Sequence, residues 1–246
     1  PSPGCPSCHT GPVEVAILVH DGVSAAEALA PAEVFGRVPD VAVHFVAHRT
    51  GPHPTQGRPG VLVADRAVAD WPDPDTLVVP GGLGVRRLVE DGPLLAWIAE
   101  AHRTSQWTAG ISTGTHLLGA AGVLDGCDAT GHWLLLDELS GAGAVPSADR
   151  LVRHGRVITA TGSASAFDLA LLVVDRTFGA EVAQQVRAEL ADDPDGSRHG
   201  RDHRWRRRPG RHRSAGRYVV DEPGRARQRG WSGRRRDGQS SPASSS

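Results

Sequence analysis

The chain has 246 residues and a formal net charge of -1 at pH 7, and 39% of its residues are hydrophobic. This length is enough for one or two domains with a sizeable buried core. No apolar run approaches the ~18 residues of a membrane-spanning helix, and no charged segment precedes an apolar stretch as in a signal peptide. We therefore expect a soluble, cytoplasmic protein without membrane contacts.

The charge is divided unevenly along the chain. Residues 197–246 contain 15 arginines and 4 acidic residues, whereas the preceding 196 residues contain 12 arginines and 24 acidic residues. Low apolar content together with high charge is typical of disorder. We expect residues 197–246 to form a disordered tail whose arginines make at most weak contacts with nucleic acid or another polyanion. The alternative is an arginine-rich arm that binds nucleic acid as its function.

A separate motif lies in the first residues. Cys5-Pro6-Ser7-Cys8-His9 matches C-x-x-C-H, the pattern of haem c attachment. That function would also require export, a haem pocket and an axial ligand, and a structural zinc site would require two more ligands. The neighbouring prolines and glycines favour a disordered leader over residues 1–12. We expect neither a metal nor a cofactor.

Strands and helices alternate from residue 13 onward. Short apolar runs predict buried strands at residues 13–19, 41–47, 76–79 and 107–111. Apolar residues at helical spacing predict helices at residues 24–35 and, with an interruption near Gly92-Pro93, at residues 85–103. Residues 50–59 are rich in turn formers, and residues 61–63 are a candidate arm of a small hairpin.

The second half of the chain continues this alternation. Two short strands are predicted at residues 151–153 and 157–159, and helices at residues 164–178 and 180–190. Strands that alternate with helices indicate a parallel sheet covered on both faces. We predict an α/β fold in which one domain, residues 13–196, forms a doubly wound parallel sheet within three α/β/α layers.

The pattern Gly110-Ile111-Ser112-Thr113-Gly114 comes at the end of the predicted strand at residues 107–111. Gly-x-Ser-x-Gly is the pattern of a nucleophile elbow, a sharp strand-to-helix turn that exposes one side chain above a sheet. The helix that begins at such a turn directs free backbone N–H groups toward an anion forming over Ser112. The alternative is a glycine-rich turn without chemistry.

Two other segments also follow predicted strands, namely the stretch that contains Glu27 and the turn Gly81-Gly82. Sites in parallel α/β folds lie at the carboxyl ends of the strands, so we expect these segments to meet Ser112 in one crevice. A serine hydroxyl is a weak nucleophile without a base, and Glu27 is the first candidate for acid and base. Glu27 is equally well spaced from Ser24 for a capping box.

With the elbow and the glycine turn in place, the chain resembles the ThiJ/PfpI branch of the class I glutamine amidotransferase-like superfamily in several stretches. They are Ala30-Pro31-Ala32-Glu33-Val34-Phe35, Val78-Val79-Pro80-Gly81-Gly82-Leu83-Gly84, Ser112-Thr113-Gly114, Leu118-Gly119-Ala120-Ala121-Gly122-Val123-Leu124, Ala129-Thr130-Gly131-His132-Trp133 and Thr161-Gly162-Ser163-Ala164-Ser165-Ala166-Phe167-Asp168. The resemblance extends over roughly residues 13–195. Within this branch the chain is most similar to isonitrile hydratases and to the sensor domains of AraC-type regulators.

The resemblance implies a flavodoxin-like sheet, a homodimer and a small-molecule substrate. It also implies a cysteine at the elbow, where this chain has Ser112. In isonitrile hydratases an acidic residue precedes the Gly-Pro of the first helix, and Glu27 occupies the corresponding position before Ala30-Pro31.

These implied roles give a set of candidate site residues. Ser112, Glu27 and Thr113 are the expected catalytic residues, and the backbone N–H groups of Gly82 and Thr113 are the expected oxyanion donors. Gly81 and His132 are expected to line the pocket. His116, one helical turn past Ser112, is expected to point away from the crevice and to pack within its helix.

Three functions compete. The first is an isonitrile hydratase-like lyase, in which Ser112 or an activated water attacks the isonitrile carbon, Glu27 protonates that carbon, and an N-substituted formamide is formed. The second is a non-catalytic ligand-sensing domain of the transcriptional-regulator type, in which the serine marks lost chemistry. The third is a serine hydrolase or amidase that uses Ser112 with Asp128 and His154. Too few predicted strands precede the elbow for the α/β-hydrolase fold.

Overall fold

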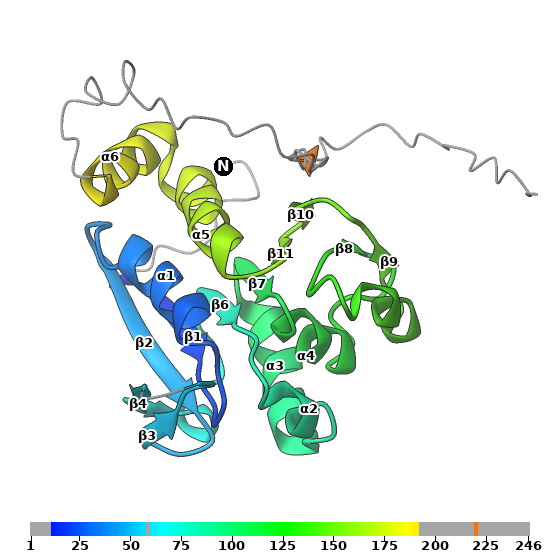
Figure 1. The fold of residues 1–246 in the computed structure, drawn as a ribbon. Helices are drawn as coiled ribbons and strands as arrows, with labels where there is room; N and C mark the ends of the chain where they lie inside the picture. Colours follow the sequence, from blue (N-terminus) through cyan, green and yellow to red (C-terminus); the bar gives the residue numbers. More distant parts are fainter. Residues whose placement is uncertain (1–10, 58–59, 192–218, 221–246) are drawn as a thin grey trace, which may run out of the picture.

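The computed structural model describes residues 11–57, 60–191 and 219–220 (Figure 1). The predicted leader lies outside these ranges except for Gly11 and Pro12, and the predicted tail lies outside them except for Val219 and Val220. Those two valines form a short strand at the edge of the main sheet. The domain boundaries and the disorder of the two end segments therefore stay predictions.

The main sheet has eight strands in the order β12, β10, β11, β7, β6, β1, β2, β5. In this order their bounds are Val219–Val220, Leu151–His154, Val157–Ala160, Trp107–Ile111, Thr76–Val79, Val13–Leu18, Val41–Ala47 and Arg66–Ala67. Neighbouring strands are parallel except for the antiparallel pair β10 and β11. The strand order reverses at β1, which lies between β2 and β6 and is therefore the topological switch point of the sheet.

Helices cover both faces of the sheet and complete a three-layer α/β/α fold (Figure 1). One face is covered by α1 (Ala25–Phe35), α5 (Ser163–Phe178) and α6 (Ala180–Leu190). The other is covered by α2 (Val85–Leu88), α3 (Gly92–Thr104) and α4 (Gly114–Ala120). No helix within the described ranges has the length and apolar character needed to cross a membrane.

Smaller elements connect these layers. β3 (Gly51–Pro54) pairs with β4 (Val61–Ala64) as an antiparallel hairpin, and β8 (Asp128–Ala129) pairs with β9 (Val145–Pro146) in parallel. Two 3-10 helices span Val68–Asp70 and Leu136–Ala142.

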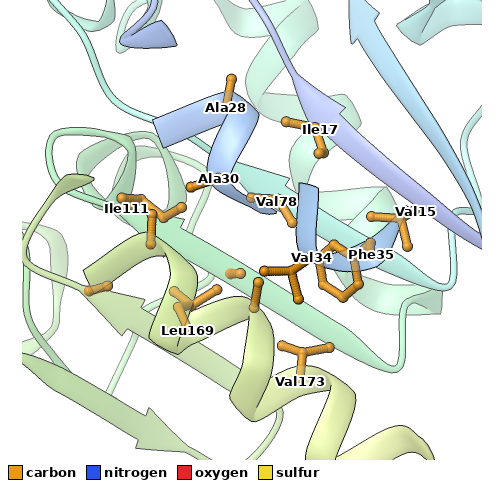
Figure 2. Close-up of a cluster of buried hydrophobic side chains, with 14 of the residues drawn as sticks. Val15, Ile17, Ala28, Ala30, Val34, Phe35, Val78, Ile111, Leu169 and Val173 are labelled. Atoms are coloured by element: carbon orange, nitrogen blue, oxygen red, sulfur yellow. The ribbon is translucent and has the colours of Figure 1, made fainter. Parts of the chain in front are cut away.

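Alternation along the strands divides the core into two clusters. Val15 and Ile17 of β1 belong to the cluster beneath α1 and α5, whereas Ala16 and Leu18 belong to the cluster beneath α3 and α4. Successive side chains of a strand point to opposite faces, so a strand buried on both faces is apolar throughout. Figure 2 shows the first cluster, in which Phe35 of α1 lies among valines of the sheet and of α5.

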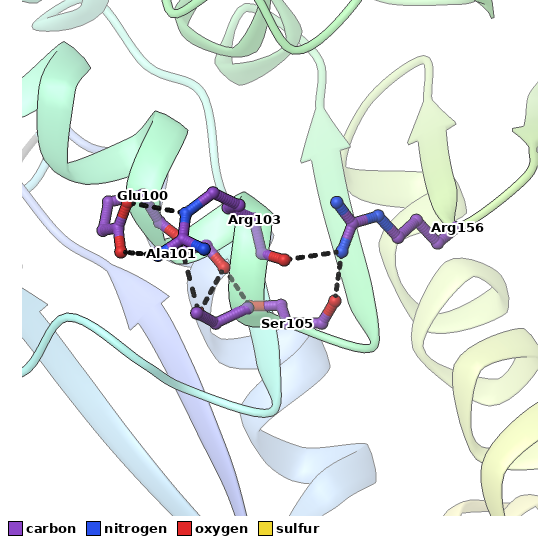
Figure 3. Close-up of polar contacts among 6 residues, drawn as sticks. Glu100, Ala101, Arg103, Ser105 and Arg156 are labelled. Atoms are coloured by element: carbon purple, nitrogen blue, oxygen red, sulfur yellow. Dashed lines mark hydrogen bonds and ion pairs between the residues drawn. The ribbon is translucent and has the colours of Figure 1, made fainter. Parts of the chain in front are cut away.

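A polar cluster fixes the connection between α3 and β7 (Figure 3). The Arg156 guanidinium donates to the carbonyl oxygens of Arg103 at 3.3 Å and Ser105 at 2.8 Å. The Ser105 hydroxyl donates to the carbonyl oxygen of Ala101 at 2.7 Å. The bonds from Arg156 give partners to carbonyl groups at the end of α3, and the Ser105 hydroxyl joins the Ser105 N–H in bonding Ala101. Together these bonds hold the beginning of the strand that leads to Ser112.

The predicted fold class is confirmed, and the principal strands and helices lie within one or two residues of their predicted bounds. Residues 50–59, predicted as turns, include the strand β3 as well. The two-residue strands β5, β8 and β9 were not predicted. Segments this short have no detectable periodicity, because pairing with a neighbouring strand is all that makes them strands.

Phe35 offers a test of this packing. Its side chain is 1% exposed, so Phe35→Ala should lower the free energy of unfolding by about 3–5 kcal/mol through lost burial and the cavity left behind. Phe167→Ala on α5 is the control, since Phe167 is 41% exposed and its removal should cost less than about 1 kcal/mol. Urea denaturation measures both, and equal losses would contradict the packing described.

Candidate active site

The elbow is present in the structure. β7 ends at Ile111 and α4 begins at Gly114, and Ser112 between them has φ = 57°. Among the non-glycine residues in the described part of the chain, only Ser112 and Asp40 have positive φ. Such a conformation costs of order 1–3 kcal/mol and occurs preferentially at functional sites. The Ser112 side chain is thereby turned toward the carboxyl ends of the strands.

Close packing explains the glycines of the motif. A Cβ atom on Gly114 would lie 2.1 Å from the carbonyl oxygen of Val79, and one on Gly110 would lie 2.8 Å from Cδ1 of Leu118. Real Cβ contacts are not this short. Gly114 therefore lets the start of α4 approach the end of β6, and Gly110 lets the same helix lie against β7.

Glu27 of α1 directs its carboxylate into the same region. The Gly81 N–H donates to Oε2 at 2.9 Å, and the Ser163 hydroxyl donates to Oε1 at 3.2 Å. Burial raises the pKa of Glu27, although hydrogen bonds from Gly81 and from the hydroxyls of Ser163, Ser112 and Ser24 act in the opposite direction. The side chain is 5% exposed, which explains why desolvation outweighs the hydrogen bonds.

The capping-box interpretation of Glu27 is wrong. Ser24 is the N-cap residue of α1, but no side-chain hydrogen bond caps the helix there. The carboxylate reaches across to the loop after β6 instead. That loop lies beside α1 because β1 and β6 are neighbours in the sheet, a pairing between distant segments.

Thr113 closes the site beside the glycine turn. Its Oγ1 accepts a hydrogen bond from the Gly82 N–H at 2.9 Å and also lies 3.3 Å from the Gly82 carbonyl oxygen. The Gly82 N–H, predicted as an oxyanion donor, is thus engaged by a hydroxyl in this structure. A Cβ on Gly81 would lie 2.5 Å from Thr113 Oγ1 and 2.9 Å from Glu27 Oε2, so only glycine fits between these two groups.

A cavity of about 810 Å³ opens above Ser112 and Glu27. Its remaining lining residues come from four segments of the chain, namely Gln56, the stretch from Gly82 to Val89 (Gly82, Leu83, Val85, Arg86, Val89), the stretch from Thr113 to Glu138 (Thr113, His116, His132, Trp133, Leu134, Leu135, Glu138) and Thr161-Gly162-Ser163. This volume lies within the range of small-molecule sites. The cavity lies over the switch point between β1 and β6, where ligands of doubly wound sheets bind.

The two histidines predicted near the elbow both line this cavity. The ring of His132 lies 6.0 Å from that of Trp133 at an interplanar angle of 25°, and a role of His132 in the site stays a prediction. The expectation that His116 points away from the crevice is wrong. Its Nε2 lies 3.0 Å from the carbonyl oxygen of Leu135, a contact that holds the ring against the segment forming the cavity wall.

Ser163 is the polar residue that the sequence reasoning missed. Its hydroxyl donates to Glu27, and it is the first residue of α5, shortly after β11 ends at Ala160. The predicted strand at residues 157–159 followed by Thr161-Gly162-Ser163 contained this signal, because the same rule about strand ends applies to it.

The residues proposed for a hydrolase triad do not reach Ser112. Asp128 and His154 contact each other, with Oδ2 and Nδ1 3.6 Å apart. Because β10 is antiparallel to β11, His154 pairs with Val157, which pairs with Thr108 near the start of β7. Ser112 follows the other end of that strand. Neither Asp128 nor His154 lines the cavity, so the triad prediction is wrong.

No three histidine, cysteine, aspartate or glutamate side chains come together as a candidate metal site within the described ranges.

Comparison with known proteins assigns the family. The family model described as the DJ-1/PfpI family matches residues 13–176. The chain belongs to the DJ-1/PfpI family. The match covers β1 through most of α5 and therefore includes every segment that contributes to the cavity.

The chain is similar to several named proteins and to a solved structure. The isonitrile hydratase of Pseudomonas putida is 34% identical over 182 residues, which cover 74% of this chain and 79% of that protein. The Parkinson disease protein 7 homolog of Danio rerio is 30% identical over 180 residues, covering 71% and 94% of the two chains. The crystal structure of a ThiJ/PfpI family protein from Pseudomonas syringae has a TM-score of 0.71 and 27% identity, and covers 78% of this chain and 83% of its own.

The buried carboxyl of Glu27 predicts a pH-dependent effect on stability. Because burial raises its pKa above the ordinary value of 4.5, the folded protein holds this proton more tightly than the unfolded chain does. The cost of burying the ionised group is absent below the ordinary pKa and complete above the raised one. Glu27→Gln should therefore raise the melting temperature at pH 8 relative to the parent, and this gain should shrink at pH 4.

Glu33→Gln provides the matched control for this measurement, because Glu33 lies on the same helix with its side chain 55% exposed. Its effect on the melting temperature should be small at both pH values. A Glu27→Gln effect of the same size at pH 4 and pH 8 would contradict the raised pKa.

Proposed function

We propose that this DJ-1/PfpI family chain is an isonitrile hydratase-like lyase, which adds water to an isonitrile and releases an N-substituted formamide. The observation that carries the proposal is the buried carboxyl of Glu27, with its raised pKa, hydrogen-bonded beside Ser112 on the floor of an open cavity. The 34% identity to the Pseudomonas putida isonitrile hydratase supports the same reaction.

Glu27 is suited to begin the reaction as an acid. A general acid works best when its pKa lies near the working pH, and a raised pKa brings the protonated carboxyl closer to neutral pH. The carboxyl gives its proton to the terminal carbon of the isonitrile, whose lone pair forms the new C–H bond. The products of this step are a nitrilium carbon and the Glu27 carboxylate, which is then able to act as a base.

Ser112 is suited to supply the nucleophile. The hydroxyl oxygen attacks the nitrilium carbon while the hydroxyl proton passes to the Glu27 carboxylate. The result is a formimidate ester of the Ser112 oxygen. Water then adds to the ester carbon, and one of its protons passes to the imidate nitrogen. The bond from that carbon to the Ser112 oxygen breaks, the second water proton passes to the Ser112 oxygen, and the formamide leaves. In a shorter route, water attacks the nitrilium carbon directly and Ser112 only shapes the floor.

Thr113 and Gly82 would stabilise charge that develops during these steps. The Thr113 backbone N–H lies at the start of α4, where helix geometry favours negative charge. The Gly82 N–H already donates to the Thr113 hydroxyl. A substrate oxygen that accepts a hydrogen bond from Gly82 must therefore displace this hydroxyl or share the N–H with it. We propose that Thr113 sets how much of the oxyanion site is open.

A ligand-sensing domain without catalysis is the second candidate. Two observations favour it, namely the serine in place of the family cysteine and the Gly82 N–H that Thr113 occupies. A serine hydroxyl has almost no anionic form at neutral pH, whereas a cysteine is partly thiolate. In this function Glu27 and Ser112 would hold a bound small molecule by hydrogen bonds alone.

The homodimer implied by the family resemblance belongs to this proposal as well. The hairpin strand β4 presents Val61 at 58% exposure and Val63 at 59% exposure, an apolar surface that a second copy could cover. Light scattering of the intact chain would give its molecular mass in solution, which distinguishes a homodimer from a monomer.

Substitutions of Ser112 distinguish the lyase from the ligand-sensing domain. Ser112→Ala should lower the turnover of small isonitriles by at least about 10³-fold, because the covalent route then lacks its nucleophile. Ser112→Cys, which restores the family residue, should keep or raise turnover. Glu27→Gln should be as damaging as Ser112→Ala, since the two groups act as one unit. Formamide release measured by chromatography gives these rates.

Ser140→Ala is the control, because Ser140 is exposed in a 3-10 helix away from the cavity lining. If Ser112→Ala keeps the parent rate while Glu27→Gln is inactive, water is the nucleophile. If the parent is inactive and Ser112→Cys gains turnover, the natural protein is a binding domain rather than a lyase.

A further inference from the structure

Exposed apolar side chains gather at the mouth of the candidate site, which is the opening of the cavity. The three most exposed large hydrophobic side chains in the described part of the chain are Trp133 at 74%, Leu83 at 73% and Leu134 at 64%. All three line the cavity above Ser112 and Glu27. Exposed apolar side chains that gather at one place mark a binding surface, whereas scattered ones need no explanation.

Hydrogen bonds hold the backbone at Leu83 and at Leu134, on two sides of the opening. Leu83 belongs to the loop after β6, and its N–H donates to Gln56 Oε1 at 3.1 Å. Trp133 and Leu134 follow β8, where the Leu134 N–H donates to His132 Nδ1 at 3.3 Å. A backbone that is already held loses little conformational entropy when a ligand binds.

Floor and mouth differ in polarity. The floor consists of Glu27, Ser112 and neighbouring hydroxyl and glycine residues, whereas the mouth carries Leu83, Trp133 and Leu134. The formally charged side chains farther out are one arginine, Arg86, and one glutamate, Glu138, whose charges cancel. This distribution suits a ligand that is polar at one end and uncharged and apolar at the other.

The geometry of an isonitrile matches this division, because its R–N≡C unit is linear. When the terminal carbon meets Glu27 and Ser112, the substituent on nitrogen must extend away from the floor toward the opening. A cavity of about 810 Å³ leaves most of its space empty around a methyl substituent. Burying an apolar substituent against the mouth removes both surfaces from water, which favours binding.

We infer that the substrate carries a bulky, uncharged apolar substituent, preferably an aromatic ring, which binds between Leu83 and the Trp133-Leu134 pair. Trp133 offers the ring face for stacking, extending the contact already present between the His132 and Trp133 rings. This inference rests on the proposed function for the identity of the reacting group. The mouth then selects the substrate by its substituent, while the floor performs the addition of water.

Trp133→Ala tests the inference through two substrates that differ only in the substituent. For phenyl isonitrile, kcat/KM should fall about three- to tenfold, the effect of losing one aromatic contact. For methyl isonitrile, kcat/KM should stay within twofold of the parent, because that substituent does not reach the mouth. Val145→Ala, at a side chain 54% exposed outside the cavity lining, is the control and should change neither value.

A binding measurement tests the mouth independently of catalysis. Calorimetry should give tighter binding of formanilide than of N-methylformamide to the intact protein, and Trp133→Ala should remove that difference. If no isonitrile is turned over but this preference is present, the proposed function fails and the mouth assignment stands. Equal binding of both formamides, or a Trp133→Ala variant whose only change is a lower oligomeric mass by light scattering, would overturn the inference.

Discussion

The hydrogen bond from the Gly81 N–H to the Glu27 carboxylate is the interaction on which the site depends. It joins α1, which follows β1, to the loop after β6, 54 residues farther along the chain. Because β1 and β6 pair in parallel, their carboxyl ends lie side by side at the switch point of the sheet. The bond holds the carboxyl group in a buried position, where desolvation raises its pKa although the bond itself acts in the opposite direction.

Two backbone constraints hold Ser112 beside that carboxyl. Ser112 itself has positive φ, and Gly114 allows the start of α4 to approach the end of β6 more closely than any residue with a Cβ atom would. These features are independent of whether the nucleophile is a hydroxyl or a thiol. These backbone constraints hold the elbow in this DJ-1/PfpI family chain whichever side chain stands at position 112.

In the proposed function, the floor and the mouth of the cavity have separate roles. Glu27 and Ser112 have polar neighbours and little solvent exposure, which suits bond making and proton transfer. Leu83, Trp133 and Leu134 are exposed and apolar, which suits selection by a substituent that does not react. Leu83 shares the loop after β6 with Gly81 and Gly82, whereas Trp133 and Leu134 lie on the separate segment after β8. We therefore expect substitutions at Trp133 and Leu134 to change substrate preference while the floor stays in place.

Local features determined much of this protein from the sequence alone. The apolar runs fixed the principal strands, and Gly110-Ile111-Ser112-Thr113-Gly114 fixed the elbow, because periodicity and turn chemistry depend only on neighbouring residues. The tertiary structure decided what depends on segments far apart in the sequence. It brought the Glu27 carboxyl to Gly81 rather than to its helix cap, and placed His116 at the cavity. It also left Asp128 and His154 at the wrong end of β7, because β10 runs antiparallel to β11.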